Sequence, residues 1–99
     1  MLSSKVLEAL NKQIKMEGDS SQVYLAMASW AEVQGFEGIS TFMYKQSDEE
    51  RMHMLKLIKY VNQRGGEATV GSTLEPKLDV TNYKALFKQL LEHEIKVSE

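Results

Sequence analysis

Helix-breaking residues are scarce in this chain, and their scarcity restricts the fold more than any other feature. Six glycines and one proline, Pro76, occur among the 99 residues. Residues 39–64 contain neither, and before Gly35 only Gly18 interrupts, at a cost of about 1 kcal/mol relative to alanine. Long helices are therefore expected, and a chain of this length has room for one domain. We predict a single all-α domain over residues 1–99.

Breakers and capping residues predict three helices: about residues 5–34 with Ser4 as N-cap, about residues 39–64, and from about Asn82 onward with Thr81 as N-cap. Only residues 35–38 separate the first two helices, and so short a loop predicts an antiparallel hairpin. Residues 65–79 are rich in turn formers and can reach roughly 50 Å when extended. Because the second helix is only about 39 Å long, this segment can cross over and start the third helix parallel to the second.

Composition excludes several classes of protein. A formal charge of -2 without a cluster of Lys and Arg is unlike a general nucleic-acid binder, which must neutralise phosphates. The absence of cysteine excludes disulfides, Cys-ligated zinc, iron–sulfur centres and a thiol nucleophile. No apolar run approaches the roughly 20 residues of a membrane helix, and the first residues lack the apolar core of a signal peptide. We expect a cytoplasmic protein that binds neither nucleic acid nor membranes.

Acidic residues interrupt the apolar stripe of every predicted helix. Glu17 lies within the first stripe, Glu50 and His53 within the second, and Glu94 within the third. Glu50 and His53 stand at i and i+3 and so project from one helix face. The apolar neighbours at helical spacing are Val6, Leu10, Ile14, Tyr24, Ala28 and Ala31 in the first helix, Met43, Leu57 and Tyr60 in the second, and Tyr83, Leu86, Leu90 and Val97 in the third. All four polar residues are thus predicted to face inward.

These four side chains are predicted to converge on a metal site. If the crossover starts the second and third helices at the same end, Glu50 and Glu94 share a level, and Glu17 and His53 come close to it across the hairpin. Each buried carboxylate costs several kcal/mol unless it is compensated, whereas a whole domain is stable by roughly 5–15 kcal/mol. A cation resolves the conflict, and inward Glu with Glu-x-x-His is the arrangement of di-iron and di-manganese bundles. Carboxylates with one imidazole suit Fe(II) or Mn(II).

A second reading remains open at this point. Each carboxylate could instead be neutral or paired with Lys, Arg or Tyr, and His53 could be an ordinary core histidine. The chain would then be a non-enzymatic helical interaction module, whose helix faces serve only assembly. Metal binding distinguishes the two readings.

The chain resembles the bacterial non-haem ferritins from its first helix to its last residue. The stretches QGFEGISTFMYKQSDEERMHM and LLEHE carry the resemblance in combination. It implies a ferritin-like four-helix bundle, of which this chain supplies two helices, the crossover and the start of a third. It also implies the site residues: iron ligands Glu17, Glu50, His53 and Glu94, with Glu50 bridging two ions; Glu49 at a neighbouring third iron site; and Tyr24 as the tyrosine beside the site, a candidate catalytic residue.

The chemistry implied by the resemblance is ferroxidation and iron storage. Two Fe(II) ions are oxidised by oxygen or peroxide, and Fe(III) passes to a mineral inside a homo-oligomeric shell. Haem is not expected, because Arg51 stands where bacterioferritins carry a haem-ligating Met after the bridging Glu. The chain corresponds to a little over half a ferritin subunit, so we expect a fragment whose remaining helices supply further ligands. Alternatively, two hairpins of a homodimer would bring together two copies of Glu17 and of the motif Glu50-x-x-His53.

Overall fold

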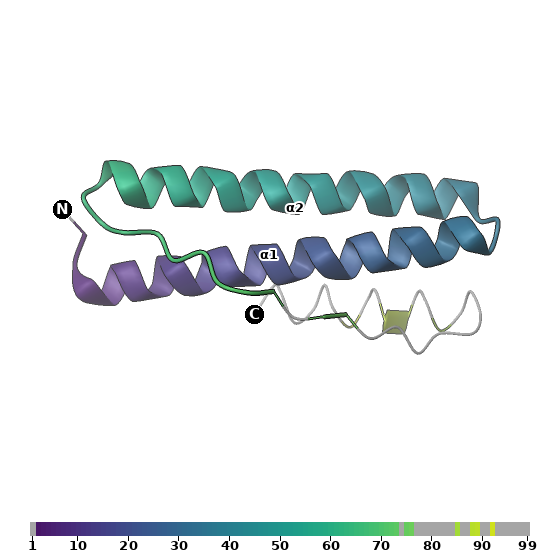
Figure 1. The fold of residues 1–99 in the computed structure, drawn as a ribbon, viewed down its shortest axis with the longest axis horizontal. Coiled ribbons are helices and arrows are strands. Elements are labelled where there is room, and N and C mark those ends of the chain that lie inside the picture. The colour runs from purple at the N-terminus through teal and green to yellow at the C-terminus, as the bar shows by residue number, and fades with distance from the viewer. Residues whose placement is uncertain (1, 74, 77–84, 86–87, 90–91, 93–99) are drawn as a thin grey trace.

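Two long antiparallel helices make up most of the described chain (Figure 1). The computed structural model describes residues 2–73, 75–76, 85, 88–89 and 92. Helix α1 spans Ser4–Val33 and helix α2 spans Glu37–Gln63. The predicted all-α fold and the hairpin are confirmed within these residues, which include no strand. Neither α1 nor α2 is long and apolar enough to cross a membrane.

Helix α1 begins one residue earlier than predicted, and its N-cap is Ser3, not Ser4. Ser3 has an extended backbone (φ -68°, ψ 156°), and its side-chain oxygen accepts a hydrogen bond of 3.2 Å from the Val6 amide. Two adjacent serines are equivalent by residue type, and the cap is the one whose oxygen reaches the amide three residues on. Helix α2 likewise begins at Glu37, so Gly38 lies in its first turn rather than in the loop.

Both helices end in the same glycine motif. Gly35 (φ 85°) and Gly65 (φ 82°) follow the last helical turns and adopt the left-handed conformation that side chains with a Cβ rarely take. The residue after each glycine closes the motif: the Phe36 amide donates to the Ala31 carbonyl at 2.9 Å, and the Gly66 amide donates to the Val61 carbonyl at 3.0 Å. These bonds satisfy carbonyls that the helix leaves open, and each helix ends two residues before its glycine.

Serine hydroxyls hold α1 and α2 in register. Ser21 Oγ donates to the Ser47 carbonyl at 2.9 Å, and Ser47 Oγ donates to the Ser21 carbonyl at 2.8 Å. One heptad away, Ser40 Oγ donates to the Ala28 carbonyl at 3.0 Å. A step of seven residues toward the turn on α1, from Ser21 to Ala28, thus corresponds to a step of seven residues toward the turn on α2, from Ser47 to Ser40. The helices keep one rotational phase over this distance, as in coiled-coil packing.

The Ser21–Ser47 pair provides a direct test of this register. Replacing Ser47 by Val removes one donor and places two methyl groups where Ser47, only 5% exposed, meets α1. We expect the free energy of unfolding to fall by about 1–3 kcal/mol, because a bonded hydroxyl is lost and the close approach is overfilled. Chemical denaturation measures the change. The control is Ser29→Val, at an exposed position of α1; an equal effect of the two variants would contradict the role of Ser47.

A cluster of buried side chains lies in the half of the hairpin nearer its turn. Five buried side chains form one cluster: Tyr24, Met27, Ala28, Ala31 and Met43. Trp30 and Phe36 pack against it, with their ring centroids 6.1 Å apart, and so does Ala85. Because Ala85 follows the crossover in sequence, the chain has travelled from the end of α2 back to the turn by this residue. This contact supports the predicted crossover.

The first part of the crossover is docked on α1 (Figure 1). Asn11 holds it with both ends of its amide, donating to the Glu67 carbonyl at 3.2 Å and accepting from the Thr69 amide at 2.8 Å. Further along, a Cβ on Gly18 would meet the Thr73 side chain at 3.4 Å. Residues 67–73 therefore run along α1 in its own direction. The predicted third helix falls mostly outside the described residues, although Ala85, Lys88, Gln89 and Glu92 are helical.

Candidate metal centre

The register of the hairpin brings Glu17 and Glu50 to the same level. Glu17 lies one turn before Ser21 on α1, and Glu50 lies one turn after Ser47 on α2. Since the helices are antiparallel, both positions fall on the side of the Ser21–Ser47 pair that is away from the hairpin turn. His53 follows Glu50 by three residues and projects from nearly the same face of α2.

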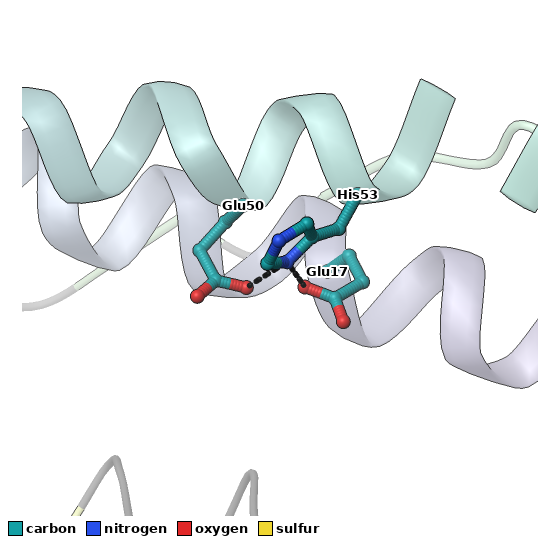
Figure 2. Close-up of side chains that lie close together, drawn as sticks. All are labelled: Glu17, Glu50 and His53. Carbon is teal, nitrogen blue, oxygen red and sulfur yellow. Dashed lines mark ion pairs between the residues drawn. The ribbon is translucent and has the colours of Figure 1, made fainter. Parts of the chain in front are cut away.

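These three side chains point toward one another (Figure 2). His53 Nδ1 lies 3.7 Å from Glu17 Oε2 and 3.8 Å from Glu50 Oε2. These distances are too long for hydrogen bonds. They suit a shared cation, because metal–ligand bonds of about 2.0–2.2 Å allow two ligands to be up to about 4.4 Å apart. One ligand atom from each residue lies within 4.8 Å of the others.

The two carboxylates are buried, and His53 is not. The side chains of Glu17 and Glu50 are 12% and 11% exposed, whereas that of His53 is 54% exposed. The prediction that His53 faces inward is therefore wrong. Its ring lies at the edge of the α1–α2 interface, where it reaches the carboxylates but the described residues leave one side uncovered. Tyr60 and Val6, at the outer ends of the predicted stripes, are also exposed, at 42% and 47%.

A glutamine one turn earlier on the same helix bonds each carboxylate. Gln13 Nε2 donates to Glu17 Oε1 at 3.0 Å, and Gln46 Nε2 donates to Glu50 Oε1 at 3.2 Å. In both cases the other oxygen, Oε2, is the one that faces His53. Glu17 Oε2 is fully buried and has no hydrogen-bond partner among the described residues.

Burial raises the pKa of Glu17 from 4.5 to about 7. The neighbouring Glu50 carboxyl also raises it, whereas the hydrogen bond from Gln13 and the charge of His53 act in the opposite direction. Below about pH 7 the metal-free protein thus keeps a proton on the buried Glu17 carboxyl group. A cation at this position would replace the proton and satisfy the unpartnered oxygen.

The donor set and the fold can be compared with known proteins. The family model described as the ferritin-like domain matches residues 7–99. The chain belongs to this family. The predicted resemblance is confirmed, and it covers almost the whole sequence.

Two curated relatives of this chain both carry names of the bacterial non-heme ferritin type. It is 37% identical over 98 residues to the "Bacterial non-heme ferritin" of Staphylococcus aureus (strain USA300), covering 99% of this chain and 59% of the relative. It is 37% identical over 94 residues to the "Probable bacterial non-heme ferritin-like protein" of Haemophilus influenzae, covering 95% of this chain and 57% of that protein. The chain therefore spans less than two thirds of the length of these curated relatives.

Solved ferritins share the fold. The ferritin of Chlorobium tepidum superimposes with a TM-score of 0.91 at 31% identity, covering 98% of this chain and 60% of that one. An open-pore ferritin from Archaeoglobus fulgidus superimposes with a TM-score of 0.90 at 38% identity, with the same coverage. The predicted ferritin-like bundle is confirmed as the fold to which this hairpin belongs.

The structure brings together three of the six predicted site residues of the ferritin-like chain. Glu17, Glu50 and His53 meet as described. Tyr24 is 2% exposed and lies in the core cluster, about 10 Å along α1 from Glu17. Glu49 is half-buried beside Glu50 and does not belong to the group of three. Glu94 lies outside the described residues.

Sequence reasoning missed Gln13 and Gln46. The available signal was the repeated spacing, with a glutamine four residues before each inward carboxylate on α1 and on α2.

Proposed function

We propose that this chain is part of an iron-storage protein that oxidises Fe(II) at a site containing Glu17, Glu50 and His53. Each Fe(II) gives up one electron to become Fe(III), so a pair of ions supplies two electrons. These electrons reduce oxygen to peroxide or peroxide to water. The Fe(III) product then passes to a mineral store.

The observation that carries the proposal is the unpartnered, fully buried oxygen of Glu17 beside a second buried carboxylate. Two such groups are costly without a counter-charge. Among the described residues, no Lys or Arg forms an ion pair with either of them, and His53 stays beyond hydrogen-bond distance. Two carboxylates and one imidazole are the donors that a ferrous ion accepts.

Each residue has a proposed role. On the family relationship, Glu50 is the ligand that would bridge the two ions. Glu17 and His53 bind the same ion, and Glu94 adds a further carboxylate from the third helix. Glu49 belongs to a neighbouring third iron site. We also propose, on the family relationship, a cytoplasmic location, no haem, and assembly of the complete subunit into a homo-oligomeric shell.

Addition of Fe(II) to the metal-free chain tests the function. We expect stoichiometric iron binding under argon and, after admission of oxygen, a rise in ferric absorbance faster than in buffer alone. The same protein kept under argon is the control for autoxidation. A chain that binds no iron above the buffer level would be an interaction module instead. Size measurement with and without Fe(II) shows whether two hairpins share the site.

Tyr24 is proposed to act in the oxidation, as an electron donor or as a hydrogen-bond partner of a ligand. Tyr24→Phe keeps the ring in the core cluster and removes only the hydroxyl. We expect slower oxidation, by roughly tenfold, with the melting temperature changed by only a few degrees. Stopped-flow absorbance after Fe(II) addition measures the rate. An unchanged rate and an unchanged spectrum would leave Tyr24 with a packing role only.

A further inference from the structure

The side chains that donate hydrogen bonds to Glu17 and Glu50 are neutral glutamine amides, not cations. A carboxylate on a helix can be bonded from one turn earlier by a cation or by an amide. Asp19, on the same helix as Glu17, forms an ion pair with Lys15, whose Nζ lies 2.9 Å from Asp19 Oδ2. Glu17 and Glu50 instead accept hydrogen bonds from the neutral amides of Gln13 and Gln46. A lysine at either position would place a positive charge beside the carboxyl group and compete with a metal ion, whereas a glutamine amide adds no charge.

The two contacts have the same geometry on opposite helices. Each amide binds Oε1, and each leaves Oε2 within 3.8 Å of the same atom, His53 Nδ1. A carboxylate bonded at one oxygen can no longer rotate freely about its last side-chain bond. Its second oxygen is therefore held toward the common point before any ion arrives, and less ordering is needed on binding.

We propose that Gln13 and Gln46 are matched positioning residues, which hold Glu17 and Glu50 pre-oriented for a divalent cation. Neither glutamine binds the ion. The inference rests on the proposed function, because it assigns an outer-shell partner to each proposed ligand. Outer-shell partners of metal ligands are worth about 10–100-fold in metal affinity.

Co(II) titration of the full chain tests this proposal without iron oxidation. Gln13→Met and Gln46→Met keep the length and helix propensity of the side chain and remove the donor. We expect the dissociation constant for Co(II) to rise about tenfold or more in each variant, with a changed Co(II) visible spectrum. The melting temperature of the metal-free protein should stay within a few degrees of the wild type. The matched control is Gln22→Met, at a half-buried position of α1 outside the site.

A second pair of variants separates neutral from charged donors. Gln13→Lys and Gln46→Lys keep a donor one turn before each ligand but add a positive charge. We expect them to bind Co(II) more weakly than the Met variants. If either Met variant does not fold, the variant at the other glutamine decides the outcome, since the two contacts are equivalent.

The outcomes distinguish this inference from the proposed function. If the wild type binds no Co(II) or Fe(II), the proposed function and this inference both fail. If the wild type binds Co(II) and the Gln13 and Gln46 variants bind it within twofold of the Gln22→Met control, only this inference is overturned.

Discussion

Replacement of Glu50 by Ala is expected to slow Fe(II) oxidation by at least about 100-fold, and His53→Ala is expected to act in the same direction. The physical reason is that Glu50 Oε2 and His53 Nδ1 lie only 3.8 Å apart with Glu17 beside them, so each variant removes one of three converging donors. Loss of an outer-shell partner already costs about 10–100-fold, and loss of a direct ligand should cost more. Initial rates of ferric absorbance after Fe(II) addition measure the effect.

The control for this experiment is Asp48→Ala. Asp48 is exposed on α2, so the variant removes one negative charge close to the site without removing a donor. Its rate should stay within about twofold of the wild type, because exposed charges are screened by salt. Unchanged kinetics in both Glu50→Ala and His53→Ala would refute the assignment of the site.

The metal-free chain is expected to lose stability as pH rises from about 4.5 to about 7, through Glu17. The unfolded Glu17 has its ordinary pKa of 4.5, and burial raises the folded pKa to about 7. Between these values the folded chain holds one proton more than the unfolded chain, so the free energy of unfolding falls with rising pH. Glu17→Gln removes this titration. It should therefore stabilise the metal-free protein above pH 7, on the order of 2 kcal/mol, while weakening Fe(II) binding.

Denaturation curves at several pH values measure this difference between Glu17→Gln and the wild type. Comparing the two proteins cancels the contribution of every other titrating group. The control is Glu8→Gln, at an exposed position of α1, for which we expect parallel curves. A Glu17→Gln variant that is less stable than the wild type above pH 7 would mean that Glu17 is paired structurally. Iron affinity of the wild type should also rise with pH up to about 7, because binding releases the Glu17 proton.

Two of the structural results depended on contacts that spacing alone does not determine. The exposure of His53, at 54%, reflects where the edge of the α1–α2 interface falls. A one-residue difference in helix phase is a rotation of about 100°, which moves a side chain from the interior to the edge. The N-cap of α1 also differs from the prediction by one residue, since it is Ser3 and not Ser4.

The sequence by itself determined the helices, the hairpin and the identity of the three converging residues. Scarce glycine and proline make long helices, helical spacing places Glu50 and His53 on one face, and a short loop sets Glu17 opposite them. Tertiary structure alone decided the distances at the site and the two glutamine contacts. The physical reason is that spacing specifies which residues share a face, whereas axial register and side-chain rotamers depend on atoms of both helices, such as the reciprocal bonds of Ser21 and Ser47.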